Sequence, residues 1–347
     1  MLQYYFLIFF LSLFISLLFT LIMIKTASWL NIVDIPDKKR KIHKANTPLL
    51  GGVAIFAAFF ILMYLFRFRI LAGNLEASHW QGVFIGACFL VIGGWLDDKY
   101  DLKPKHQVIF PVLAVVAVIA GGVSIAKISN PFGGFIYLQS LSAILIFFWL
   151  MGMMYTTKLL DGLDGLVAGI TAIGGAIIFL FTMTTKYYQP DIGLAALVLS
   201  GVCLGFLIFN WHPARIFLGE GGSMFLGYIL GVLAIISGGK IAIALLVMGI
   251  PIMDVAWTII RRLREGNNPF KFADRKHLHF RLLDLGLSVR QAVIIFYLLA
   301  IIFGLSALFL QTKGKIFALI ILLIIMLAII IKINNMNNKE KNIINNT

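Results

Sequence analysis

Long apolar runs are the feature that most restricts how this chain can fold. Its mean hydropathy is +0.97 over 347 residues, which leaves too little polar surface to cover the apolar mass of a soluble domain. A helix needs about 20 mostly apolar residues to cross a hydrocarbon layer. Eleven runs of roughly this size occur, at about residues 4–26, 49–66, 80–96, 108–126, 138–157, 165–185, 192–209, 222–237, 241–260, 291–310 and 316–332. The sequence therefore predicts an all-α integral membrane protein with about eleven transmembrane helices.

The ends of the chain complete this expected organisation. The first run is too long for the apolar part of a secretory signal and lacks a small-residue cleavage pattern, so we expect a permanent helix. Residues 1–333 are predicted to form one polytopic membrane domain, and residues 334–347, rich in Asn and Lys, a disordered cytoplasmic tail. Cys88 and Cys203 lie inside apolar runs, which favours packing over a disulfide or a metal site.

Basic residues predict the orientation in the membrane. When the loops are divided alternately, one set with the carboxy-terminal tail holds 21 Lys and Arg and the other set holds 7. Cytoplasmic loops carry the excess of basic residues, so we expect the N-terminus outside and the C-terminus in the cytoplasm. The net charge of +14 then reflects topology and attraction to anionic lipids and substrates. Nucleic acid is not an expected partner, because no soluble basic domain is present.

The acidic residues show which side carries the chemistry. Of the 15 Asp and Glu, only Glu76 and Asp191 fall on the predicted outer side. The other acids, and every histidine except His79, lie in cytoplasmic loops or at the inner ends of helices. We therefore expect the site to act on a cytosolic substrate.

Asp97 and Asp98 close the third apolar run. Two adjacent carboxylates at a membrane boundary repel each other and are costly to desolvate. A cation or a proton transfer is one reason for such a pair. The alternative is a solvated loop start, with lysines at 99, 103 and 105 as counter-charges.

Two further islands combine acids with glycines. Asp161 and Asp164 are three residues apart, which places them on one face if the segment is helical, and the glycines between and after them let a ligand approach the backbone. Lys158 precedes them, and its simplest role is an interfacial lysine reaching outward. The segment 217–223 ends in Gly-Glu-Gly-Gly-Ser, which suits phosphate at a helix N-terminus. Phe217 could stack on a base, but a membrane-interface anchor is the favoured interpretation.

The loop 261–290 is the longest predicted cytoplasmic connection and carries eight Lys and Arg. His277 and His279 lie among these cations. Nearby positive charge disfavours a metal ion, so the pair is better suited to an anionic pyrophosphate. Asp254 lies near the inner end of the preceding run, on one helix face with Arg261, where we expect a structural ion pair.

Taken in order, these islands resemble the motifs of the polyprenyl-phosphate N-acetylhexosamine-1-phosphate transferases, glycosyltransferase family 4. The likeness runs from about Asp34 to Ser288. The first loop (Pro36-Asp37 through His43, then Pro48 and Gly51-Gly52), the segment 97–102 and His277-Leu278-His279 are more similar to the WecA/TagO branch than to the MraY translocases.

The resemblance implies a phosphoryl transfer in the cell membrane, with the active site on the cytoplasmic face. A polyprenyl phosphate (undecaprenyl phosphate) would attack the β-phosphorus of a UDP-N-acetylhexosamine, UDP-GlcNAc by expectation, and release UMP. The product would be the first lipid-linked intermediate of cell-wall or surface glycan synthesis. Mg²⁺, or Mn²⁺ in its place, would be the cofactor, since the two reacting anions repel. A homodimer is also a family expectation.

The resemblance also assigns roles to individual residues. Either Asp97 or Asp98 would be the base, although a covalent role for an Asp stays open. The full expected set is catalytic Asp97, Asp98, Asp161 and Asp164; substrate-binding Lys44, Lys105, Lys158, Asn210, Phe217, His277, His279 and Arg281; and metal-binding Glu220 and Asp161.

Three residues depart from the family pattern. Lys158 stands where the family has Asn, Glu220 where it has the metal-binding Asp, and Phe280 where it has the last His of the motif. Glutamate is one methylene longer than aspartate, and a lysine beside a cation repels it. We hypothesise an active enzyme with altered metal dependence, in which either Lys158 replaces part of the metal's charge or the site is rearranged around Glu220 and Asp161.

Three alternatives remain open from the sequence. The first is an MraY-like enzyme that uses UDP-MurNAc-pentapeptide, against which the first loop argues. The second is a transporter or channel, which predicts acids near the bilayer midplane and paired repeats; neither pattern is found. The third is a non-catalytic homologue, motivated by Lys158 and Glu220.

Overall fold

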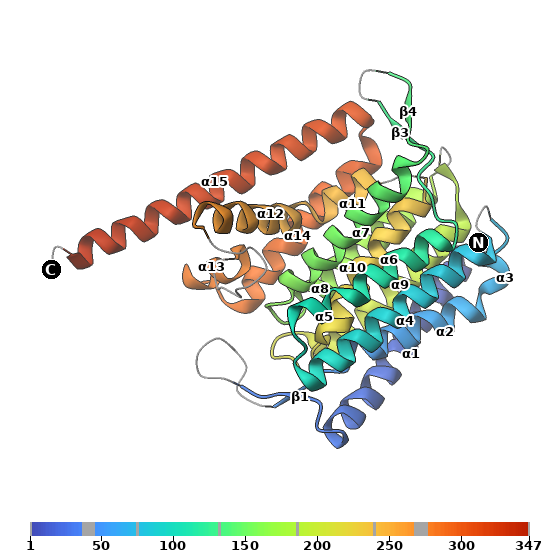
Figure 1. Cartoon of the computed structure of the whole chain (residues 1–347), viewed down its shortest axis with the longest axis horizontal. Helices are drawn as coiled ribbons and strands as arrows, with labels where there is room; N and C mark the ends of the chain where they lie inside the picture. The colour runs from blue at the N-terminus through green and yellow to red at the C-terminus, as the bar shows by residue number, and fades with distance from the viewer. Residues whose placement is uncertain are drawn as a thin grey trace.

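The computed structural model describes residues 2–36, 46–73, 76–130, 133–184, 187–238, 241–266 and 277–345. Most of its helices run side by side in one bundle, and the carboxy-terminal helix extends away from it (Figure 1). In these ranges the helices are α1 (Leu2–Trp29), α2 (Gly51–Leu65), α3 (Arg67–Ile70), α4 (Ala77–Tyr100), α5 (Pro104–Gln107), α6 (Ile109–Ala120), α7 (Leu141–Leu160), α8 (Leu166–Thr182), α9 (Pro190–Asn210), α10 (Gly219–Ile236), α11 (Ile241–Val247), α12 (Gly249–Arg264), α13 (Leu278–Asp284), α14 (Val289–Phe309) and α15 (Thr312–Asn345).

The all-α membrane class predicted from the apolar runs is confirmed. Within the described ranges, seven helices are long and apolar enough to cross a membrane, or eight if the bent pair α11 and α12 is one span. Three more apolar segments, Gly51–Leu65, Pro104–Ala120 and Leu166–Thr182, are shorter. Each of the eleven predicted runs is thus helical, and the number that cross the bilayer stays a prediction, as does the orientation.

Helices α9 and α10 form the centre of the bundle. In the apolar window of α10, 89% of the residues are buried in protein, and 78% in that of α9, against 22% for α1 and 17% for α15. All four helices are strongly apolar, so the difference lies in what covers them. Protein packs around the central pair, whereas α1 and α15 expose large apolar side chains, as expected for helices in contact with lipid.

Backbone contacts between glycines bring α2, α4 and α10 together. A Cβ added to Gly94 of α4 would lie 2.0 Å from the backbone nitrogen of Gly221 in α10. A Cβ on Gly52 of α2 would lie 2.1 Å from the Cα of Gly222. Small residues permit this close approach of helices, and it places the end of α4 against the start of α10.

Local sequence determines where α4 begins and ends. At its start, Glu76 and His79 form a capping box, in which the Glu76 N–H donates to His79 Nδ1 at 2.9 Å. At its end, Asp101 adopts a left-handed conformation with φ 48°, a conformation that Asp tolerates better than most residues. The helix therefore stops just after Asp97 and Asp98, and both carboxylates lie in its last turn.

Short strands tie the first loop to the start of α10. Strands β1 (Val33–Asp34) and β2 (Thr47–Pro48) pair antiparallel. The Phe217 N–H donates to the Pro48 carbonyl at 2.8 Å, and the Gly51 N–H donates to the Phe217 carbonyl at 3.0 Å. A second antiparallel pair, β3 (Lys127–Ser129) and β4 (Phe135–Tyr137), lies near the opposite end of the bundle (Figure 1).

The apolar run 241–260 is interrupted, which its hydropathy does not reveal. Helices α11 and α12 meet at an angle of 78°, and Pro251, whose missing N–H is tolerated in a first turn, lies near the start of α12. The buried residues Asp254, Thr258 and Arg262 recur every four positions, so α12 turns a polar stripe toward the protein. Its direction depends on this polar stripe as well as on apolar surface.

The last helix is longer than its apolar run. Helix α15 continues to Asn345, through the segment predicted to be a disordered tail. The proposed division at residue 333 stays a prediction.

We expect Gly94→Ala to lower the apparent melting temperature of the protein in detergent. The added methyl group would collide with the Gly221 backbone, and overpacking of this kind costs about 1–3 kcal/mol. Gly152→Ala in α7 is the matched control, because no atom lies within 4 Å of its added Cβ. Equal melting temperatures for the two variants would contradict the close contact.

Candidate active site

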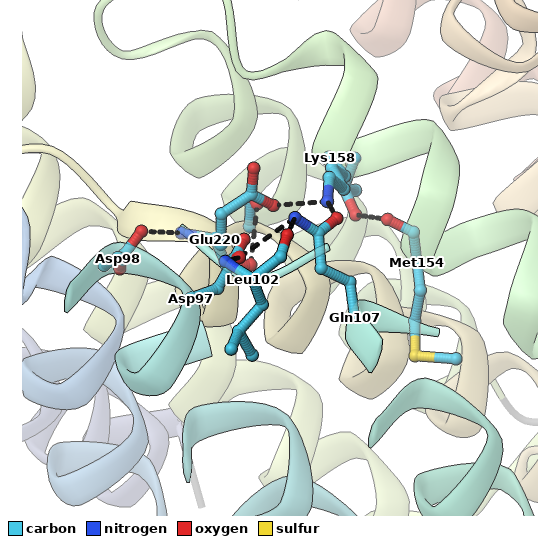
Figure 2. Close-up of polar contacts among 9 residues, drawn as sticks. Asp97, Asp98, Leu102, Gln107, Met154, Lys158 and Glu220 are labelled. Atoms are coloured by element: carbon cyan, nitrogen blue, oxygen red, sulfur yellow. Dashed lines mark hydrogen bonds and ion pairs between the residues drawn. The ribbon is translucent and has the colours of Figure 1, made fainter. Parts of the chain in front are cut away.

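Carboxylates from three segments meet where α4 ends and α10 begins. Asp98 lies in the last turn of α4, Asp161 follows α7, and Glu220 lies in the first turn of α10. The Glu220 N–H donates to Asp98 Oδ1 at 3.2 Å, which joins α4 to the N-terminus of α10 (Figure 2). A carboxylate is favoured at a helix N-terminus, so this contact places Asp98 against the start of α10.

Lys158 lies within this carboxylate cluster. Its Nζ is 2.8 Å from Glu220 Oε2 and donates to Gln107 Oε1 at 3.1 Å (Figure 2). The side chain is only 17% exposed, and its place in the last turn of α7 favours a cation. Lys158 therefore bridges α7, α10 and the short helix α5.

Gln107 was not predicted as a site residue. Its Nε2 donates to Asp97 Oδ1 and to the Leu102 carbonyl, each at 2.9 Å. A continuous polar chain thus runs from Glu220 through Lys158 and Gln107 to Asp97. A glutamine in the loop 97–107 is an ordinary loop residue by sequence, so only the fold reveals this role.

The two adjacent aspartates have different surroundings. Asp97 Oδ1 accepts from the Leu102 N–H at 2.9 Å as well as from Gln107, and so holds the turn after α4. Among the described residues, Asp98 accepts one hydrogen bond, from the Glu220 N–H. It lines a small hollow with Trp95, with Leu49 and Leu50 before α2, and with four apolar residues or glycines of α2, α4 and α10. Asp98 is therefore the freer of the two.

The carboxylates influence the acidity of Asp161. Surrounding protein and then the charges of Glu220, Asp164 and Asp98 raise the pKa of the Asp161 carboxyl. The Asp161 residue is itself exposed, so solvent screens part of the burial effect. Repulsion from the neighbouring carboxylates therefore contributes strongly to this rise in pKa.

Asp164 and Asn210 hold the loop between α9 and α10. Asp164 Oδ2 lies 2.6 Å from His212 Nδ1 and accepts from the Ala214 N–H at 3.0 Å. Asn210, which is 4% exposed, accepts from the Gly165 N–H at 3.0 Å and donates to the Ile216 carbonyl at 2.8 Å. Both residues therefore connect two of the predicted islands. Whether they also contact substrate stays a prediction.

His277 is held by Asp254, which was expected to pair with Arg261. Its Nδ1 lies 2.9 Å from Asp254 Oδ2, and the Leu278 N–H donates to Asp254 Oδ1 at 2.9 Å. Asp254 thus clamps the start of α13 with both oxygens, and the predicted ion pair with Arg261 is not needed to account for its burial. Asp254 and His277 are 23 residues apart in the chain, so only the fold reveals this contact.

His279 is fully buried beside the Asp161–Gly165 island. A Cβ added to Gly162 would lie 2.4 Å from its Nε2. Burial lowers the pKa of the His279 imidazole to about 3, so the ring is neutral at pH 7. Neither ring nitrogen has a hydrogen-bond partner among the described residues. The close approach of His279 to Gly162 brings α13 to the edge of the carboxylate cluster.

The remaining predicted residues are more scattered. Arg281 is half-buried on α13, Phe217 is half-buried before α10, and Lys105 is exposed on α5. Lys44 lies outside the described residues. The structure thus unites Asp97, Asp98, Lys158 and Glu220 and places Asp161, Asp164, Asn210 and His279 around them.

The described residues do not form a cage for a divalent cation. No group of three or more His, Cys, Asp or Glu among them is arranged to hold a metal ion. The Glu220 oxygen that faces the cluster is 2.8 Å from the Lys158 ammonium, whereas Mg²⁺ binds oxygen at about 2.0–2.1 Å. The cluster in this arrangement does not fit Mg²⁺ at Glu220.

Acids, a lysine and glycine-bearing helix ends gather at one end of a bundle of apolar helices, an arrangement suited to the active site of a membrane enzyme. The sequence model of glycosyl transferase family 4 matches residues 80–238. The chain is 32% identical to a probable undecaprenyl-phosphate N-acetylglucosaminyl 1-phosphate transferase of Bacillus subtilis, over 96% of this chain and 92% of that protein. It is 30% identical to a decaprenyl-phosphate N-acetylglucosaminephosphotransferase of Mycobacterium tuberculosis, over 78% of this chain and 74% of that protein. The chain belongs to glycosyl transferase family 4, as its motifs predict.

We expect Asp254→Ala to destabilise the protein more than Asp254→Asn. Alanine leaves the buried Leu278 N–H without its acceptor and leaves His277 Nδ1 with only the longer, 3.4 Å contact to Thr258 Oγ1. An unsatisfied buried group costs about 1–3 kcal/mol. Asparagine still offers one oxygen. The apparent melting temperature in detergent measures the difference, and Asp284→Ala, at an exposed position of α13, is the control. The prediction fails if Asp254→Ala melts like Asp284→Ala.

Proposed function

We propose that this protein transfers N-acetylglucosamine 1-phosphate from UDP-GlcNAc to a polyprenyl phosphate. An oxygen of the acceptor phosphate forms a bond to the β-phosphorus of the donor, the bond from that phosphorus to the bridging oxygen breaks, and UMP leaves. The products are UMP and a polyprenyl-diphospho-GlcNAc. The activities for which the relatives are named support the sugar phosphate and the lipid acceptor. The observation that carries the proposal is the cluster of Asp98, Lys158 and Glu220 at the ends of membrane helices.

Asp98 is the residue best placed to take the acceptor's proton. Asp97 uses an oxygen for the Leu102 N–H and Gln107, whereas Asp98 accepts one backbone N–H and borders a hollow. A general base must reach the proton it removes. We therefore assign the role of general base to Asp98. Asp97 holds the turn that follows α4.

Positive side chains must offset the charge of two reacting phosphates. Lys158 supplies one such charge within the cluster. His277, His279 and Arg281 are proposed for the donor diphosphate, although the burial of both histidines means that the ligand would first have to reach α13. Lys44 and Lys105 are proposed as further cationic contacts, and Phe217 for the uracil. The Mg²⁺ expected from the family resemblance is assigned no step, because the Glu220 carboxylate faces the Lys158 ammonium.

The setting of the reaction follows from the helices and the charge distribution. The protein is a multi-pass membrane protein, and we propose the cell membrane as its location, with the N-terminus outside, the active site on the cytoplasmic face and a homodimer as its assembly. The excess of basic residues in one set of loops supports this orientation. The lipid-linked product would begin cell-wall or surface glycan synthesis.

The test is UMP release by purified protein supplied with undecaprenyl phosphate and UDP-GlcNAc. UMP that forms only when both substrates are present supports the proposal. Release with UDP-MurNAc-pentapeptide and none with UDP-GlcNAc would replace it with the MraY-like reaction. No release with either donor, by protein that is folded and monodisperse, would overturn the transferase activity.

We expect Asp98→Asn to reduce UMP release much more than Asp97→Asn. Loss of a general base lowers turnover by about 10²–10⁴-fold, whereas loss of a residue that only orients its neighbours costs about 10-fold. Initial rates at saturating substrates compare the two variants. A larger loss for Asp97→Asn would exchange the two assignments.

A further inference from the structure

The carboxylate cluster already contains a cation of its own. Lys158 Nζ lies 2.8 Å from Glu220 Oε2 and 3.1 Å from Gln107 Oε1, and it is close enough to Asp98 for an electrostatic interaction. The side chain is 17% exposed and that of Glu220 is 35% exposed. An ammonium so enclosed differs from a surface lysine whose charge extends into water.

The neighbouring acids require a positive charge at this position. Glu220 and Asp97 act repulsively on Asp98, and Lys158, 2.8 Å from Glu220, acts attractively on it. A cation among them offsets that repulsion. The ammonium is tethered through α7, so it is present whether or not an ion is bound.

We propose that Lys158 is the built-in cation of this site and takes the place that a divalent ion would otherwise need beside Glu220. An ion bound to Glu220 Oε2 at about 2.0–2.1 Å would lie within a few ångströms of the ammonium 2.8 Å away, and the two cations would repel each other. Divalent binding at Glu220 is therefore weakened by Lys158. The charge of Lys158 offsets the negative charge of the carboxylates in place of a divalent ion.

The same geometry points to what Lys158 does for substrate. An ammonium has three N–H donors, and Glu220 and Gln107 account for two of them. Among the described residues no partner takes the third, which is available to donate to a phosphate oxygen. This step rests on the proposed function, whereas the competition with a divalent ion does not.

Two measurements on the full-length protein in detergent test the proposal. The first is Mn²⁺ binding, followed by electron paramagnetic resonance without substrates. We expect Lys158→Met to bind Mn²⁺ at least 10-fold more tightly than the wild type. Lys158→Arg, which keeps the charge, should bind as weakly as the wild type, and Lys103→Met, an exposed lysine near the same face, should also match it.

The second measurement is UMP release in EDTA and in Mg²⁺. We expect the wild type and Lys158→Arg to retain turnover in EDTA, and Lys158→Met to lose at least 100-fold there and to regain turnover with Mg²⁺. Melting temperatures near that of the wild type show that the variants are folded.

The outcomes separate this proposal from the proposed function. Equal Mn²⁺ affinity for wild type and Lys158→Met, or wild-type turnover that is abolished by EDTA, would overturn the built-in cation. If no variant releases UMP, the transferase activity fails, and the Mn²⁺ comparison still decides whether Lys158 excludes a divalent ion.

Discussion

The contact between the backbones of α4 and α10 is the constraint on which the site depends. Gly94 and Gly221 meet so closely that a Cβ on either glycine would collide with the other helix. This approach brings the last turn of α4 to the first turn of α10, where Asp98 accepts from the Glu220 N–H. Without it, the acids of the two helices would be separated by the width of larger side chains.

The carboxylates that the fold brings together repel one another, and side chains beside them offset this repulsion. Several carboxylates share one end of the bundle, and each disfavours the charge of the others. Lys158 enters from α7 and contacts Glu220, and Gln107 connects the lysine to Asp97. The ion pair is only partly buried, so its contribution to stability is modest; its importance lies in where it places charge.

Several polar residues around the site serve the structure that carries it. Asn210 joins Gly165 to Ile216, and Asp164 contacts His212. Asp254 holds His277 and the start of α13. Buried polar groups are stable only when they are hydrogen-bonded, so these contacts make the loops around the cluster rigid. A residue that a motif marks as functional can therefore be necessary because it positions others.

The sequence by itself determined the class of protein and the parts of the site. Apolar runs, glycine-rich acidic islands and their order predicted an all-α membrane protein of the correct family, and Lys158 and Glu220 were visible as paired departures. Hydropathy and motif order are properties of neighbouring residues, so they can be read along the chain. Only the tertiary structure distinguished Asp98 from Asp97 and showed that Gln107 contacts Lys158. It also showed that Asp254 contacts His277 and that the run 241–260 forms two helices. These features depend on which helix faces meet and at what distance, and that is decided by packing between segments far apart in the sequence.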